Sequence, residues 1–333
     1  HSSEHRMPAT VHVSESTRAS MRVIITIAAL VVLLVPIAFS VAHGASRLNY
    51  AKLDVTKPLS TSVTDLKFLL DTTASVTVET TETDEPTVRL TATGPRDEAP
   101  TLQVREAEDS STVSVDDQRN LENAQIEVTL PAKTSKEMKL DFNGGYGAIE
   151  VVGDYQEIVA KTDGGAVDVS GSAERLQTST DYGMTDLSGT FDTIESKTGV
   201  GTLNGSNLNV RDHVDAVTST GTIDLDFTND MVPMSGIVAK ADEGTIDIRL
   251  PRLDLAQERM AAEAAASKDD DGSAADAKDL FYRINANSNE GSVDLAKDVK
   301  KYDAARSSKD AEGKTIIPVS ASTDMGTITI EQN

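Results

Sequence analysis

The sequence predicts an all-β protein, a β-solenoid-like or β-helix-like stack of about 18-residue repeats with one N-terminal transmembrane helix and a short helical insertion. Three observations predict this fold. A phrase of glycine, small residue, aliphatic, acid and aliphatic recurs through residues 143–333, and a strand-like segment with alternating aliphatic residues precedes each glycine. An uncharged apolar run lies ahead of all of these strands.

The apolar run extends from Val23 to Ala42 and reads VIITIAALVVLLVPIAFSVA. At 1.5 Å of rise per residue, about twenty helical residues span a hydrocarbon core of about 30 Å. Arg22 directly precedes the run, which favours the N-terminus on the inside. We therefore expect a cytoplasmic tail at 1–22, a transmembrane helix or signal anchor at 23–42 and a linker at 43–54.

The alternative is a cleaved signal peptide, because Ser40, Val41 and Ala42 resemble the small residues at a signal-peptidase site. Both alternatives place the β domain of residues 55–333 outside the cytoplasm. The expected location is the cell membrane, with a single pass, or the exterior if the segment is cleaved.

The glycine phrases follow one another at intervals of 18, 18, 18, 20, 23, 47 and 35 residues. They begin at Gly147, Gly165, Gly183, Gly201, Gly221, Gly244, Gly291 and Gly326. Glycine suits a corner where φ is positive or two backbones approach closely. Because alternate residues of a strand share a face, the aliphatic residues are expected to point inward and the acid outward.

The two long intervals are expected to hold insertions at 252–280 and 296–313, in the same stacking scheme. The first opens with an Ala-rich, helix-favouring run, and the second is a charged loop. Residues 52–131 lack the regular interval but contain strand-like runs. They are expected to form a meander that joins or caps the repeats, or a separate sandwich.

These features resemble the adhesin-type β-strand-repeat domain of bacterial cell-envelope proteins. The resemblance lies in IEVTLPAKTSKEMKLDFNGGYGAIEV from Ile126, in the recurrent glycine phrase, and in DIRLPR from Asp247, and it covers roughly residues 55–333. A membrane segment ahead of such a domain is similar to actinobacterial members. The resemblance implies a stacked β fold at the cell envelope, with no established enzymatic activity and no catalytic residues to carry over to this chain.

Composition excludes several classes of function. A formal net charge of −23 argues against nucleic acid as a partner, because phosphate binding requires clustered Lys and Arg. The chain has no cysteine and no tryptophan, so thiolate chemistry is absent and aromatic platforms for sugars are scarce. His213 is the one histidine beyond residue 43, and no G-x-S-x-G motif accompanies it.

No catalytic, cofactor-binding or metal-binding residue is assigned, and no cofactor is expected. Acids that follow the glycines by three residues form a candidate outward column, at Glu150, Asp168, Asp186, Asp224, Asp247 and Asp294. The phrase GGAVDVSG lacks the second spaced glycine of the calcium-binding nonapeptide. Residues 267–278 resemble an EF-hand loop, but Lys278 stands where the bidentate glutamate is required.

The expected function is therefore a non-enzymatic, membrane-anchored surface protein that presents a rigid acidic surface to an envelope protein or wall polymer. One alternative is an accessory role in envelope-stress sensing through the N-terminal tail. The other is a β-helix enzyme acting on wall polysaccharide.

Overall fold

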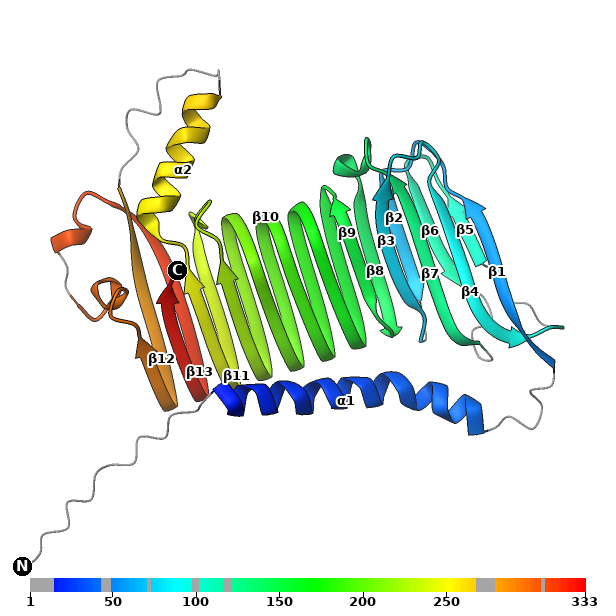
Figure 1. The fold of residues 1–333 in the computed structure, drawn as a ribbon, viewed down its shortest axis with the longest axis horizontal. Coiled ribbons are helices and arrows are strands. Elements are labelled where there is room, and N and C mark those ends of the chain that lie inside the picture. The colour runs from blue at the N-terminus through cyan, green and yellow to red at the C-terminus, as the bar shows by residue number, and fades with distance from the viewer. Residues whose placement is uncertain are drawn as a thin grey trace, which may run out of the picture.

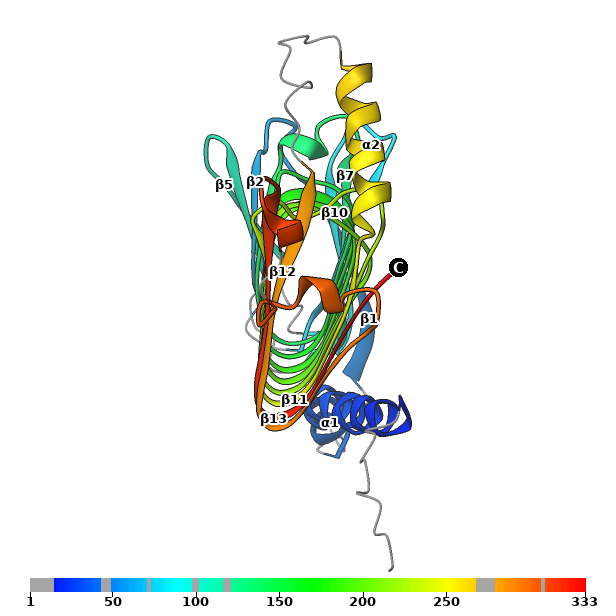
Figure 2. The ribbon, with the colours of Figure 1, turned by 90° about the vertical axis from the view of Figure 1, so that its left-hand side faces the viewer.

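The computed structural model describes a mostly β protein whose strands form one sheet with thirteen members (Figure 1). The described residues are 15–42, 49–70, 73–97, 102–115, 121–267, 279–306 and 309–333. The sheet runs the length of the molecule, and helix α1 (Glu15–Ala42) lies along one side of it. Figure 2 shows the turns end-on, as two arms that meet at one corner.

The strands are numbered in the order in which they occur along the chain. They are β1 (Tyr50–Pro58), β2 (Asp65–Leu70), β3 (Ser75–Thr81), β4 (Thr87–Pro95), β5 (Leu102–Glu106), β6 (Ser110–Val115), β7 (Glu122–Pro131), β8 (Lys139–Tyr146), β9 (Ile149–Asp154), β10 (Glu157–Phe227), β11 (Gly236–Leu250), β12 (Leu280–Leu295) and β13 (Thr315–Gln332). Helix α2 (Leu253–Ala266) and the short 3-10 helices η3 (Ser135–Glu137), η5 (Lys300–Tyr302) and η6 (Lys309–Ala311) lie between strands.

The two arms are the segments before and after each glycine, which we call the pre-glycine and post-glycine faces. In the pre-glycine face, β10 pairs in parallel with β8, so that Ile158 lies beside Leu140. In the post-glycine face, β10 pairs in parallel with β9, so that Val167 lies beside Ile149. Both pairings join residues 18 positions apart, which is the predicted repeat interval.

The corner needs glycine because successive turns touch there. At Gly183 the φ angle is +141°, and a Cβ atom would overlap the carbonyl oxygen of Gly165 on the turn below. A side chain is therefore excluded by both backbone conformation and space. Each stacked corner repeats this contact, in the spatial order Gly147, Gly165, Gly183, Gly201, Gly221, Gly244, Gly326 and Gly291.

The predicted inward aliphatic residues are confirmed as the core. Val167, Val169, Ile223 and Ile246 are among the residues with at most 1% of their surface exposed. The interior also contains a row of buried threonine and serine hydroxyls near the corner, which the sequence analysis did not predict. It consists of Thr162, Thr178, Thr180, Thr185, Ser196, Thr198, Thr202, Thr218, Thr222, Thr245 and Thr323.

The N-terminal strands are part of the same sheet and not a separate sandwich. Strands β2 and β3 form a turn that pairs with β8 and β9, with Phe68 stacked on Phe142 at a centroid distance of 4.6 Å. Strands β6 and β7 pair onto the outer side of β2 and β3. The antiparallel strands β5, β4 and β1 complete this end. Strand β1 begins at Tyr50, within the segment predicted as a linker.

The order of the last turns differs from their order in the chain. The sequence analysis placed the turns of Gly291 and Gly326 in the same stacking scheme without giving their order. In the structure, β13 lies between β11 and β12, with Ile328 beside Ile246 on one side and Val293 on the other. The C-terminal strand is inserted between two earlier ones, and β12 becomes the end of the stack. The segments 252–280 and 296–313 give the chain the length to do this.

The end of the stack is covered on one face. The loop after β12 forms a parallel bridge between Asp303 and Ile284, and the Ala304 N–H donates to the carbonyl of Ile284 at 2.7 Å. The Tyr302 ring packs edge-on against Tyr282, with ring centroids 5.3 Å apart. We call this segment the capping loop; it covers β12 around Tyr282 and Ile284.

Candidate functional site

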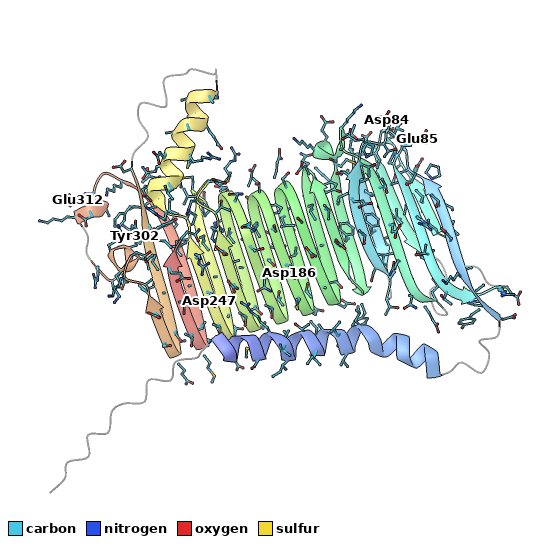
Figure 3. All side chains as sticks on the ribbon, viewed as in Figure 1. Asp84, Glu85, Asp186, Asp247, Tyr302 and Glu312 are labelled. Atoms are coloured by element: carbon cyan, nitrogen blue, oxygen red, sulfur yellow. The ribbon has the colours of Figure 1, made fainter. Side chains whose placement is uncertain are left out.

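The six predicted acids lie on the outer side of the post-glycine face, in a column that neutral residues interrupt. We call it the outer acid column (Asp186 and Asp247 are labelled in Figure 3). Glu150 lies beside Asp168, and Asp224 lies beside Asp247. Asn204 follows Asp186 and donates from Nδ2 to its Oδ1 at 3.1 Å. Thr329 separates Asp247 from Asp294.

Asp168 has carboxylates on both sides within the column. Partial burial raises the pKa of Asp168 above its ordinary value, and the negative charges of Asp186 and Glu150 raise this pKa further. Neighbouring strands lie only about 4.8 Å apart, so the rigid sheet holds these like charges close together. This part of the column therefore favours the approach of a cation or a proton.

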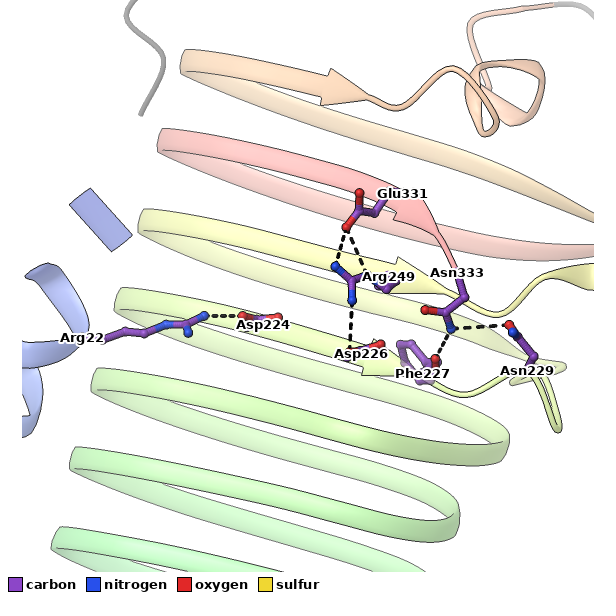
Figure 4. A network of polar contacts seen from close by, with 8 residues as sticks. All are labelled: Arg22, Asp224, Asp226, Phe227, Asn229, Arg249, Glu331 and Asn333. Carbon is purple, nitrogen blue, oxygen red and sulfur yellow. Dashed lines mark hydrogen bonds and ion pairs between the residues drawn. The ribbon is translucent and has the colours of Figure 1, made fainter. Parts of the chain in front are cut away.

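Helix α1 contributes a cation to the outer acid column at Asp224, farther along the stack. The Arg22 guanidinium pairs with the carboxylate of Asp224 (Figure 4). One helical turn later, the Thr26 hydroxyl lies 2.8 Å from the sulfur of Met184. Val32 then lies over Gly164. The helix thus runs along the stack, with about three residues for each turn that it crosses.

The two sides of α1 differ in exposure although both are apolar. Ile25 and Ala29 are buried against the stack, whereas the opposite side carries exposed aliphatic side chains. These are Val23, Ile24, Ile27, Leu30 and Val31, with Ile24 exposed to 67%. Among the residues that the structure describes, no helix combines the length and hydropathy needed to cross a membrane.

A second polar network lies beside the outer acid column, two residues further along the same strands (Figure 4). Arg249 donates to Glu331 at 2.9 Å and lies 3.5 Å from Asp226, bridging carboxylates on both neighbouring strands. Hydrogen bonding to Glu331 raises the pKa of Arg249 further. Asn333 donates to the carbonyl of Phe227. These contacts connect β10, β11 and β13, which are far apart in sequence.

The buried hydroxyl row is only partly paired. Thr178 and Ser196 share a hydrogen bond of 2.6 Å, whereas the hydroxyls of Thr198, Thr202 and Thr222 have no hydrogen-bond partner within the described part of the chain. The threonine that directly follows the corner glycine, as in GTLNG and GTIDL, is the feature of the sequence that could have indicated this row of buried hydroxyls.

The remaining sequence candidates do not converge on a site. His213 is half-buried beside Gly236 at the start of a turn. Residues 268–278, which include most of the EF-hand-like segment, lie outside the described residues. Within the described ranges, no three histidine or acidic side chains come together closely enough to hold a metal ion.

Comparison with known proteins gives only distant structural similarity. No family model matches this chain, and no curated protein matches it either. A crystal structure of a candidate adhesin from Bacteroides fragilis is similar at 15% identity and a TM-score of 0.44, covering 84% of this chain and 97% of that one. A candidate cell adhesion protein from Clostridium sporogenes gives 10% identity and a TM-score of 0.26, covering 85% and 100%.

Proposed function

We propose that this protein is a non-enzymatic surface protein of the bacterial cell envelope, a β-solenoid of adhesin type that presents a rigid acidic face. The observation that carries the proposal is the outer acid column, in which Glu150, Asp168 and Asp186 occupy neighbouring strands. A flexible chain would separate these charges, whereas the paired backbone fixes them. The surface is thereby preorganised for a partner with regularly placed positive charges.

The partner that fits this surface is an envelope protein with a basic face or a wall polymer with amino groups. One such contact exists within the protein itself, because the guanidinium of Arg22 forms an ion pair with the carboxylate of Asp224. Burial raises the pKa of Asp168, and ammonium or guanidinium groups at the spacing of the strands would relieve the repulsion from Asp186 and Glu150 that raises it further. Nucleic acid remains an unsuitable partner because its phosphates would meet the same carboxylates.

The test of this function is binding to bacterial cell-wall material by the full chain in mild detergent. We expect the chain to sediment with the wall material at low salt and to be released as the salt concentration rises. The double variant Asp168→Asn, Asp186→Asn should bind about tenfold more weakly. The matched variant Glu85→Gln, Glu312→Gln removes the same charge away from the column and should bind like the parent chain.

Two results would contradict the proposed function. The first is no binding of the parent chain to any wall fraction or envelope protein at low salt. The second is equal weakening by the two double variants, because this would assign binding to net charge and not to the column.

We further propose that residues 23–42 anchor the protein at the membrane, with α1 lying along the membrane surface through its exposed apolar side and the β domain outside the cytoplasm. The support is the uncharged sequence of this segment and the exposed apolar side of α1, which water solvates poorly. The chain should remain in the membrane fraction after washing with high salt, because the contact is apolar, and protease added to intact cells should degrade the β domain. Recovery in the soluble fraction, or full protection from protease, would contradict the anchor.

A further inference from the structure

The two ends of the post-glycine face both finish in a strand with one unpaired side. Among the described strands, β1 pairs only with β4, and β12 pairs only with β13. Among the described residues, the capping loop pairs with β12 at Ile284, through Asp303, and forms no β-bridge with residues 290–295. A free strand edge is a template for pairing with another chain, and charge or proline on the edge restricts which chain can pair. Strand β1 carries Lys52, Asp54 and Lys57 and ends at Pro58, so its partner strand must match these charges.

The apolar interior is also unfinished at these two ends. One inward column can be followed from strand to strand through the whole sheet, and its inner members, such as Leu90, Ile149 and Ile328, are fully buried or nearly so. The column ends at Val55 in β1, which is half-buried, and at Val293 in β12, which is 39% exposed. Further apolar contact is therefore available at each end.

The two ends have complementary steps. At the N-terminal end the post-glycine face extends one strand further than the pre-glycine face, because β1 lies beyond β4 whereas β5 has no strand beyond it. At the C-terminal end the pre-glycine face extends further, through the bridge of Asp303 to Ile284. Helix α1 lies beside the stack, between these ends (Figure 1). If two copies are placed end to end, the longer arm of one copy therefore meets the shorter arm of the other.

We propose that copies of this chain associate end to end, with the β1 edge of one copy pairing in parallel with the β12 edge of the next. Strand β1 is parallel to β7, since both are antiparallel to β4, and β7 has the direction of β3, β9 and the rest of the post-glycine face. The joined sheets would therefore continue without a change of strand direction.

The inward column sets the register of this pairing. If Val293 continues the column, it lies beside Val55 of the second copy, and Glu290 then lies beside Lys52. Both charged side chains are exposed, so an ion pair can form at the outer side of the joint. Asp294 lies beside Thr56 in the same register. The contact is heterologous, so repeated joining gives linear assemblies and not closed dimers.

The net charge opposes this association at low salt. Each copy carries a formal charge of −23, and screening weakens the repulsion between copies more than it weakens one local ion pair. We expect end-to-end assemblies to lengthen as the salt concentration rises. Wall binding through the outer acid column should weaken over the same range, which separates the two activities.

Disulfide trapping tests the joint directly, because the chain has no cysteine of its own. Adjacent strands place paired Cα atoms within the range that a disulfide spans. We would mix the full-chain variants Thr56→Cys and Asp294→Cys in mild detergent under oxidising conditions. The expected product is a disulfide-linked dimer that needs both variants. Glu312→Cys, at the same end but away from β12, is the matched control and should not link to Thr56→Cys.

Other outcomes overturn the proposal. No linkage in the mixture, or the same yield with the Glu312→Cys control, would show that the edges do not meet. A dimer formed as readily by Asp294→Cys alone would show a tip-to-tip contact. Circular dichroism of each variant before mixing ensures that a failure to link is not a failure to fold.

Charge reversal tests the register. Glu290→Lys and Lys52→Glu should each weaken assembly by about tenfold in sedimentation velocity, because like charges then face each other. The chain that carries both substitutions should assemble like the parent. Glu312→Lys changes the net charge as Glu290→Lys does and should not weaken assembly. Equal effects of Glu290→Lys and Glu312→Lys, or no rescue in the double variant, would contradict the register.

Discussion

The central turns of the stack and its C-terminal turns are built from the same glycine phrase but are ordered differently. In the centre, each turn stacks on the one before it in sequence, and Gly183 lies directly over Gly165. At the C-terminal end, Gly326 lies over Gly244, and Gly291 forms the outermost corner. The phrase therefore determines what a turn looks like, whereas the connecting segments determine which turns are neighbours.

At the N-terminal end, too, the spatial order of the turns differs from their order in the chain. The turn of β2 and β3 lies between that of β6 and β7, which follow it in the chain, and that of β8 and β9. Both ends contain connections longer than the short turns of the centre. A short connection allows only the adjacent position, while a long one allows a strand to skip a position.

The largest expected effect is at a central corner. Gly183→Val should destabilise the protein by about 4 kcal/mol or more, because the side chain meets the Gly165 carbonyl and the backbone has a φ of +141°. Urea unfolding followed by circular dichroism measures this. Gly144→Ala is the control, since the added methyl group finds its nearest atom at 3.7 Å, and it should change stability by less than about 1 kcal/mol. Equal effects would refute the close stacking of the corners.

An intermediate effect is expected inside the stack, where buried hydroxyls differ in pairing. Thr222→Val should stabilise the protein by about 1 kcal/mol, because it removes a buried hydroxyl without a partner and keeps the volume. Thr178→Val should destabilise it by about 1–2 kcal/mol, because Ser196 would lose its hydrogen bond at 2.6 Å. The same urea experiment compares them. Destabilisation by Thr222→Val would indicate that its hydroxyl is satisfied in solution.

The smallest effect concerns Asp168 and depends on pH. Burial and its acidic neighbours raise its pKa in the folded protein, so the folded state binds this proton more tightly than the unfolded chain does. The resulting stability is present below the unfolded pKa of about 4 and is lost as pH rises through the folded pKa. Asp168→Asn should therefore unfold at a higher urea concentration than the parent at pH 7, and at the same concentration at pH 3.

Glu312→Gln is the control for this prediction, because it removes a charge from an exposed loop. It should show no such difference between the two pH values. If Asp168→Asn is less stable than the parent at pH 7, this would contradict the claim that burial and neighbouring carboxylates disfavour the charged form of Asp168.

The sequence predicted the local geometry of the turns well. Alternation in GAVDV placed Val167 and Val169 inside and Asp168 outside, and the structure confirms this. It did not predict the neighbours of each turn, because GTIDIRL, GSVDLAK and GTITIEQ are interchangeable as strands. Neither did it predict the buried hydroxyls, since threonine is equally suited to a turn and to a strand.

The candidate surface was predicted in its residues but not in its continuity. The spacing placed six acids on one side, with Asn204 and Thr329 at the same position of their phrases. That Thr329 lies between Asp247 and Asp294 follows only from the spatial order of the turns. The contact of Arg22 with Asp224 joins residues about two hundred positions apart, and no periodicity in the sequence indicates it.

The inserted position of β13 is the central claim, and one cross-linking measurement tests it most directly. Lys240 of β11 lies beside Ser322 of β13, which in turn lies beside Asn287 of β12. The double variant Lys240→Cys, Ser322→Cys should form an intramolecular disulfide under mild oxidation, because the two strands are adjacent. Lys240→Cys, Asn287→Cys should not, because β13 separates these strands by about 9.6 Å. The opposite result, with linkage only in the second variant, would mean that the turns stack in chain order and would contradict the account.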